Sequence, residues 1–131
     1  MVISADCHGG GNIGHYRPYL ESRYHGDFDA WAETFENPFD DLDGDEGGRN
    51  WDSARRLREL EADGIVAEVL FPNTVPPFFP KVSLVHQPPG AGAGDLERRW
   101  AGLRAHNRWL ADFCADARGR RAGICQIMLH D

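Results

Sequence analysis

The chain has 131 residues, of which 41% are apolar and 11% aromatic, and its formal net charge of -7 comes from 14 Lys and Arg against 21 Asp and Glu. This composition fits one globular domain and excludes a disordered segment. The chain has no basic run longer than Arg120-Arg121, so it cannot form the positive surface on which nucleic-acid affinity depends. No apolar run approaches the about 18 residues that span a bilayer, and Cys7, Cys114 and Cys125 lack C-x-x-C spacing. We therefore expect a soluble, cytoplasmic protein that binds neither nucleic acid nor membranes.

The first predicted element is a short buried strand over residues 2–5, because its β-prone residues are followed by Asp6-Cys7-His8 and a run of three glycines. In the aromatic and acidic stretch that comes next, Asp27 is placed to cap the start of a helix. Residues 38–50 carry many acidic residues and glycines, so charge repulsion and backbone entropy oppose regular structure there. We expect this segment to be a solvated loop.

A helix and a strand are predicted next. Asn50 is the expected cap of a helix over residues 51–63, which Gly64 ends. Residues 65–71 are then almost continuously apolar, as in the strands of a covered parallel sheet. The apolar stripe of this helix consists of Trp51, Ala54, Leu57 and Leu60.

A second helix and strand complete the pattern. Residues 73–94, rich in proline and glycine, form a long connection of the kind that is often functional, so we expect it near the mouth of a site. Asp95 is the expected cap of the next helix, Gly119 ends that helix, and residues 122–129 are predicted to be a third buried strand. The stripe of this helix consists of Leu96, Trp100, Leu103, Asn107, Leu110, Cys114 and Ala117.

The order of these elements predicts an α/β fold with a parallel sheet and right-handed crossovers. Two architectures are open. One is a small three-stranded α/β domain, and the other is the N-terminal part of a (β/α)8 TIM barrel of roughly 250 residues or more. We favour the barrel, because three parallel strands alone leave two bare edges and an uncovered face. Residues 1–131 are then its N-terminal portion, truncated at the C-terminus.

Asp6 and His8 are the candidate metal ligands. They are two residues apart at the carboxyl end of the first strand, so the alternation of a strand points both side chains to one face. A carboxylate and an imidazole suit Zn²⁺, Mn²⁺ or a similar divalent ion, and the glycines that follow leave room for an ion and a substrate. An Asp-x-His pattern is short, and a strand end that begins a turn is the alternative interpretation.

Several stretches carry a family resemblance. They are Ile3-Ser4-Ala5-Asp6-Cys7-His8-Gly9-Gly10, Asp27-Phe28-Asp29-Ala30-Trp31, the segment from Trp51-Asp52-Ser53-Ala54-Arg55-Arg56-Leu57 through Glu68-Val69-Leu70-Phe71-Pro72-Asn73-Thr74, and His106-Asn107-Arg108-Trp109-Leu110-Ala111-Asp112-Phe113. Together they cover nearly the whole chain and resemble the amidohydrolase-related proteins, the amidohydrolase 2 branch of metal-dependent TIM-barrel enzymes.

This resemblance implies that Asp6 and His8 are first-strand ligands of a divalent metal ion, with zinc as the expected ion. Members of the family take further His and Asp ligands from later strands, which have no counterpart in residues 1–131, and Gly10 stands where a second His of the D-x-H-x-H spelling would fall. The chain alone is therefore expected to be inactive, with its catalytic base outside these residues. Whether Asp6 binds the ion directly or orients His8 is open.

The function implied by the resemblance is a metal-dependent hydrolase that acts on a small-molecule substrate through a metal-activated water. Asn73, directly after the predicted second strand, is the expected substrate contact, with a plain Pro-Asn-Thr turn as the alternative. Two other functions are open: a metal-dependent non-oxidative decarboxylase (a lyase) of the same family, and a non-catalytic fragment or small α/β binding domain. The full-length protein could also be a homo-oligomer.

Three more residues have structural roles in this interpretation. Glu68 lies within an apolar strand and must be paired, because an isolated buried carboxylate is unfavourable. Asn107 should bond a backbone carbonyl or a Trp indole in the core, and Cys7 should point away from the metal ligands and pack against helices. His15 and His25 are expected to be surface or hinge residues rather than ligands.

Overall fold

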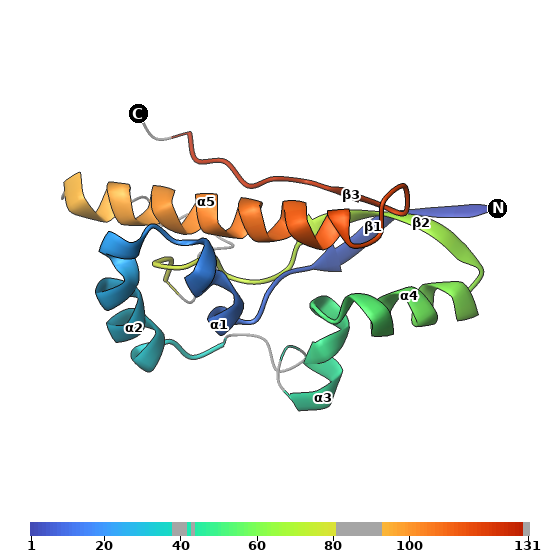
Figure 1. The fold of residues 1–131 in the computed structure, drawn as a ribbon, viewed down its shortest axis with the longest axis horizontal. Coiled ribbons are helices and arrows are strands. Elements are labelled where there is room, and N and C mark those ends of the chain that lie inside the picture. The colour runs from blue at the N-terminus through green and yellow to red at the C-terminus, as the bar shows by residue number, and fades with distance from the viewer. Residues whose placement is uncertain (38–41, 43, 81–92, 130–131) are drawn as a thin grey trace.

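The chain folds around a three-stranded parallel sheet with the strand order β1-β2-β3. The computed structural model describes residues 1–37, 42, 44–80 and 93–129 (Figure 1). The central strand β2 pairs with β1 as far as Pro72 opposite Gly9. The predicted α/β fold with a parallel sheet is confirmed. The strands are β1 (Val2–Gly9), β2 (Ile65–Pro72) and β3 (Arg121–Gly123).

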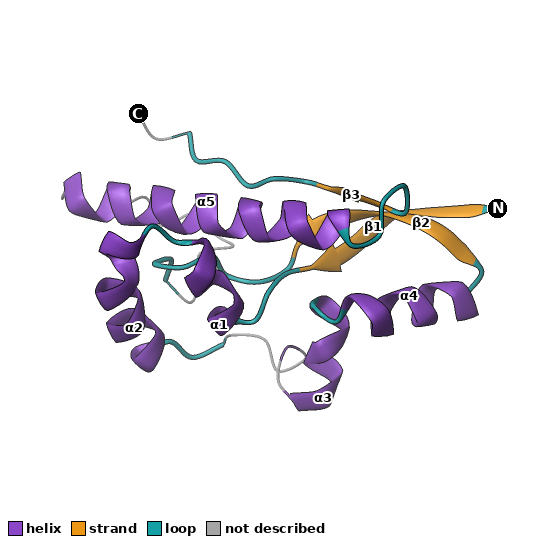
Figure 2. Ribbon diagram, viewed as in Figure 1, coloured by secondary structure: helices purple, strands orange, loops and turns teal. Residues whose placement is uncertain are grey.

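Helices connect these strands, as a parallel sheet requires (Figure 2). α4 (Ser53–Ala62) leads into β2, and α5 (Ala93–Ala115) leads into β3. Within the described ranges, no helix combines the length and the apolar character needed to cross a membrane. The other helical segments are α1 (Ile13–Tyr16), η1 (Arg17–Tyr19), η2 (Ser22–Tyr24), α2 (His25–Thr34), α3 (Gly44–Gly47) and η4 (Gly48–Asn50).

α4 and α5 cover the same side of the sheet. Glu68, in the middle of β2, points to that side, where its carboxylate accepts hydrogen bonds from Arg56 of α4 and Arg121 of β3. Arg121 in turn donates to the carbonyl oxygen of Phe113 on α5 at 3.0 Å. Phe71 has the opposite parity to Glu68 on β2, so it belongs to the other side, and its side chain is exposed. Among the described residues, the sheet therefore has one covered face and one open face.

The hydrophobic core lies between α5 and the helices that follow β1. Trp109 and Phe113 stack on α5 with their ring centroids 4.9 Å apart, and Tyr16 of α1 meets Trp109 edge-on at 5.9 Å. Phe28 of α2 packs edge-on against Phe78 at 6.3 Å in the same cluster. The core is thus built largely from aromatic rings, and it lies away from the open face of the sheet.

β1 is longer than predicted, because it ends at Gly9 rather than at residue 5. Its register against β2 shifts between Ser4 and Cys7, so β1 holds one more residue than β2 over this stretch. The bulge puts both side chains on one face, where Cys7 Sγ lies 3.1 Å from Ser4 Oγ. Cys7 packs against the core, which confirms its predicted orientation.

α4 begins at Ser53, and Asp52 rather than Asn50 is its cap. The Asp52 carboxylate accepts a hydrogen bond from the backbone N–H of Arg55 at 2.9 Å, which satisfies a free donor of the first turn. Arg56 is the buried residue of the helix because it faces Glu68 of β2. Of the predicted apolar stripe, Trp51, Leu57 and Leu60 are half-buried and Ala54 is exposed.

In contrast to α4, the other two predicted helices begin earlier than their predicted caps. α5 begins at Ala93, so Asp95 lies in its first turn. α2 begins at His25, so Asp27 likewise lies in the first turn. There its carboxylate does not cap the helix but stabilises it by interacting with the positive end of the helix dipole. Gly64, with a positive φ angle of 73°, follows the end of α4 as predicted. The prediction that Gly119 ends the next helix is wrong: α5 ends at Ala115, and Gly119, with a φ angle of 76°, lies in the turn that follows.

Two segments differ in kind from their predictions. The predicted loop over residues 38–50 lies partly outside the described residues, but residues 44–50 form α3 and η4, held in part by Arg55, whose Nη1 donates to the Asp45 carbonyl oxygen at 2.6 Å. β3 ends at Gly123 rather than at residue 129. The N–H of Ile124 still donates to the carbonyl oxygen of Leu70 on β2 at 2.9 Å, but the backbone of Gln126 bonds the Asn107 side chain of α5 instead of a strand.

Candidate functional site

The structure places Asp6 and His8 side by side near the carboxyl end of β1. Nε2 of His8 lies 3.9 Å from Oδ1 of Asp6, and 53% of the His8 side chain and 86% of the Asp6 side chain are exposed. The Phe71 ring on β2 lies beside the His8 ring with a centroid distance of 6.1 Å, which puts His8 on the open face. The Asp6–His8 pair is therefore accessible from solvent.

The donors of this pair suit a divalent ion of the zinc type, since a carboxylate oxygen and an imidazole nitrogen are both zinc ligands. A separation of 3.9 Å is too long for a hydrogen bond, so Asp6 does not orient His8 through one. Among the described residues, no three or more His, Cys, Asp or Glu side chains are arranged to hold a metal. The Asp6–His8 pair thus supplies part of a ligand set.

The glycines that follow β1, Gly10 and Gly11, are buried. A Cβ atom at Gly10 would lie 2.3 Å from the hydroxyl oxygen of Thr74, and one at Gly11 would lie 3.2 Å from the Trp109 ring. The sequence suggested that these glycines leave room for an ion and a substrate. They instead allow the loop to pack directly against the side chains of the core.

Asn73 lies at the carboxyl end of β2, beside the loop that follows β1, and its backbone N–H donates to the carbonyl oxygen of Gly9 at 3.2 Å. Its side-chain Nδ2 donates to Oδ1 of Asn50 at 2.8 Å, and Asn50 donates to the carbonyl oxygen of Gly47 at 3.0 Å. Asn50 therefore links β2 to α3 instead of capping a helix. A substrate contact by Asn73 stays a prediction.

A second polar group, which sequence reasoning missed, lies inside the core. His106 of α5 is fully buried, and its Nδ1 lies 3.1 Å from the Tyr16 hydroxyl. That hydroxyl also hydrogen bonds to the Thr74 hydroxyl and accepts the Gly11 N–H at 2.8 Å. Burial lowers the pKa of His106 to about 4 and raises the pKa of Tyr16 well above its ordinary value. Both side chains are therefore neutral around neutral pH.

The spacing of residues on α5 could have revealed this group. Gly102, His106, Trp109 and Phe113 follow one another at intervals of four, three and four residues, and all four are buried. The predicted stripe over residues 96–117 runs along the neighbouring side of the helix. A helical stripe defined only by strongly apolar residues does not include Gly102 and His106. It therefore does not reveal this buried group.

Glu68 is paired, as predicted. Its carboxylate is fully buried and accepts hydrogen bonds from Nη2 of Arg56 at 2.7 Å and from Nε of Arg121 at 3.1 Å. Burial by itself raises the pKa of Glu68, but the hydrogen bonds and charges of the two guanidinium groups outweigh it, and the pKa lies below its usual value. Glu68 is an ionised structural residue on the covered face, away from the Asp6–His8 pair.

Comparisons with protein families, with curated proteins and with solved structures find no match to this chain. Function is therefore inferred from the position and chemistry of the side chains. Among the described residues, two groups of polar side chains could bind or act on a ligand. They are the Asp6–His8 pair on the open face and the buried group around His106.

Proposed function

We propose that the Asp6–His8 pair holds a divalent metal ion, with zinc as the first candidate, in a metal-dependent hydrolase of the amidohydrolase-related type that acts on a small molecule. The observation that carries this proposal is the position of the pair. Both donors lie near the carboxyl end of a parallel strand, on the open face, and are largely exposed. Enzymes built on parallel α/β barrels place their sites at this end of the strands.

The strand order supports the barrel that this function needs. In a doubly wound sheet the strand order reverses and helices cover both faces, whereas strands of a (β/α)8 barrel follow in chain order with every helix outside. Here the order is β1-β2-β3, and the contacts of Glu68 place α4 and α5 on one side. The open face, with Phe71 and the Asp6–His8 pair, corresponds to the inside of such a barrel.

The residues of this chain have distinct tasks in the proposed site. A bound divalent ion would polarise a scissile carbonyl and lower the pKa of a bound water toward ~7. Asp6 contributes negative charge and His8 contributes a neutral nitrogen donor, with the Phe71 ring beside the imidazole limiting its movement. Asn73 directly follows the neighbouring strand β2, and its amide oxygen would orient a substrate while its Nδ2 donates to Asn50.

Zinc binding to the purified 131-residue chain tests this proposal. We expect one Zn²⁺ per chain by isothermal titration calorimetry, and binding weakened by more than about 100-fold in the His8→Ala variant, since it removes one of the two ligands and not a residue that only orients one. His15→Gln is the matched control, because His15 is exposed but its Nδ1 is engaged by the backbone N–H of Asn12. Equal zinc affinity in His8→Ala and His15→Gln would refute the site.

The Asp6→Asn variant distinguishes the two roles that Asp6 could have. The 3.9 Å separation of Asp6 from His8 favours direct ligation, so we expect a loss of zinc affinity as large as that of His8→Ala. A residue that only orients a ligand typically changes metal affinity about 10–100-fold. An Asp6→Asn variant with the zinc affinity of the unmodified chain would exclude both roles.

A further inference from the structure

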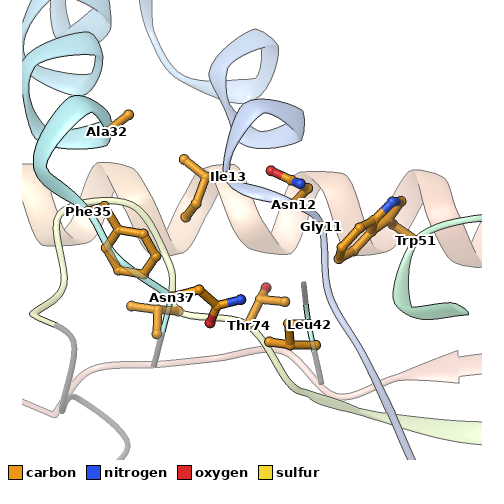
Figure 3. Close-up of a pocket in the computed structure, with 10 residues that line it drawn as sticks. Gly11, Asn12, Ile13, Ala32, Phe35, Asn37, Leu42, Trp51 and Thr74 are labelled. Atoms are coloured by element: carbon orange, nitrogen blue, oxygen red, sulfur yellow. The ribbon is translucent and has the colours of Figure 1, made fainter. Parts of the chain in front are cut away.

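A cavity of about 230 Å³ lies beyond the glycine loop, between α2, the end of β2 and the segment before α4 (Figure 3). It shares no lining residue with the Asp6–His8 pair, and it includes Thr74 and Val75 from the start of the predicted long connection over residues 73–94, of which residues 81–92 lie outside the described chain. Its volume is below the roughly 300–1,000 Å³ of sites for drug-sized ligands. A group of about the size of one ring fits it.

The lining combines apolar side chains with neutral polar groups in about equal surface. Among the described residues that line the cavity, none carries a charge. The polar side chains are Asn12, Asn37 and Thr74, which lie among larger apolar ones in Figure 3. Such side chains suit a small-molecule site, in which apolar walls supply affinity and a few polar groups fix orientation. The apolar side chains are Ile13, Phe35, Leu42, Trp51 and Val75.

Thr74 is held in place by the buried group around His106. The Tyr16 hydroxyl, which bonds to Thr74, accepts the Gly11 N–H at 2.8 Å and has a single proton of its own. If that proton goes to His106, Thr74 donates to Tyr16 and keeps its lone pairs for another donor. If it goes to Thr74 instead, the Thr74 proton is free for another acceptor. A ligand hydroxyl, which both donates and accepts, suits either arrangement.

The backbone of the glycine loop fixes the same hydroxyl from the other side. Because a Cβ at Gly10 would lie 2.3 Å from Thr74 Oγ1, residue 10 must be glycine for Thr74 to keep its place. Thr74 is also buried, so its rotamer is set by packing as well as by hydrogen bonding. A polar group held this firmly in the wall of a cavity is preorganised for a ligand.

We propose that this cavity binds a neutral, ring-sized apolar group that carries one hydroxyl, and that Thr74 positions that hydroxyl. The benzyl alcohol molecule has this chemistry. Charged analogues such as benzoate are excluded, because a carboxylate would lose its hydration without gaining a cationic partner among the described lining residues. The proposal is independent of metal binding by the Asp6–His8 pair.

Titration of the full 131-residue chain with three probes tests the proposal by ¹H–¹⁵N NMR. Benzyl alcohol should shift the indole N–H resonance of Trp51 saturably and leave that of Trp100, which does not line the cavity, in place. Toluene, which lacks the hydroxyl, should bind about three- to tenfold more weakly, the effect of one neutral hydrogen bond. Benzoate should give no saturable shift. Benzoate binding as tight as that of benzyl alcohol would overturn the proposal.

Variants of Thr74 and of α2 complete the test. Thr74→Val should reduce benzyl alcohol affinity to the level of toluene while toluene affinity is unchanged, and Thr74→Ser should restore it. Ala32→Met should block all binding because Ala32 lines the cavity, whereas Ala30→Met, on the exposed side of the same helix, should not. This second comparison stands even if Thr74→Val does not fold. Equal effects of the two methionine variants contradict the proposal.

Discussion

Asn107 of α5 forms two hydrogen bonds with the backbone of Gln126: its Nδ2 donates to the carbonyl oxygen at 2.8 Å and its Oδ1 accepts the N–H at 2.9 Å. A primary amide that bonds both groups of one residue imitates the pairing of a neighbouring strand. The polar residue in the predicted apolar stripe thus bonds a backbone carbonyl, as predicted. It ties the extended chain after β3 to the helix, at the sheet edge where no described strand follows.

The Asn107→Leu variant keeps the size of the side chain and removes both hydrogen bonds. We expect faster hydrogen exchange at the Gln126 amide and a loss of about 1 kcal/mol in the free energy of unfolding, because two half-buried backbone groups lose their partners. Ala111→Ser, an exposed position on the same helix, is the control and should change neither quantity. Unchanged protection of Gln126 in Asn107→Leu would mean that the segment is held by something else.

The buried Glu68 cluster should be a large contributor to stability. Glu68→Gln removes the charge that compensates Arg56 and Arg121, so we expect a loss of about 3–5 kcal/mol in urea denaturation, the usual result of breaking a buried ion pair. Glu59→Gln breaks the exposed pair with Arg55 on α4 and should have only a small effect. Similar losses in the two variants would contradict a special role for Glu68.

His106 makes the free energy of unfolding depend on pH between about pH 4 and pH 6.5. Its pKa is about 4 in the folded chain and near 6.5 in the unfolded chain, so the unfolded chain takes up the proton first as the pH falls. The contribution of His106 to the free energy of unfolding is therefore fully present above about pH 6.5. It decreases by about 3 kcal/mol as the pH falls to about 4. The His106→Gln variant, which cannot titrate, should lose this slope in urea denaturation.

The same measurement has an independent check. Titration of the His106 ring by NMR gives its pKa in the folded chain directly, and a value near 6.5 would contradict the expected burial effect. Glu68 also makes stability fall in acid, because its folded pKa is lowered, but that contribution is lost only below its unfolded pKa of about 4.5. The His106 contribution begins at higher pH and can be separated from it.

Features set by local sequence were predictable. The segment from α4 through Gly64 into β2 follows from hydrophobic pattern and from the positive φ that glycine accepts. The pairing of Glu68 followed from the energetic penalty of an isolated buried charge. Asp6 lies within the β1 bulge and His8 lies beyond it, and the two side chains still come together, with Nε2 of His8 3.9 Å from Oδ1 of Asp6.

Features that depend on distant contacts were not predictable. The bulge between Ser4 and Cys7 arises from pairing with β2, which no local pattern of β1 encodes. The tyrosine–threonine–histidine group joins residues 16, 74 and 106. The cavity likewise combines residues from four separate stretches of the chain, so neither its existence nor its neutral lining could be deduced from spacing.

The open face of the sheet leads to a prediction of self-association. Ile3 of β1 is 60% exposed, and Ile127 and Leu129, in the segment after β3 at the other sheet edge, are 67% and 85% exposed. Exposed large apolar side chains and unpaired strand edges promote association. We expect the 131-residue chain to form concentration-dependent oligomers in sedimentation velocity experiments. The Ile127→Lys/Leu129→Lys double variant should shift the distribution toward monomer, because charge at a strand edge opposes further pairing.

Ala111→Lys adds charge to the exposed side of α5 and is the control for this shift, with no effect expected beyond that of net charge.

The unmodified chain also tests the barrel proposal. The face that would be the inside of a barrel has no cover among the described residues, so the isolated chain should associate or melt with low cooperativity. A monomer that stays monomeric at all concentrations and melts cooperatively would instead favour the small three-stranded α/β domain, because such a domain must be stable with its open face in water.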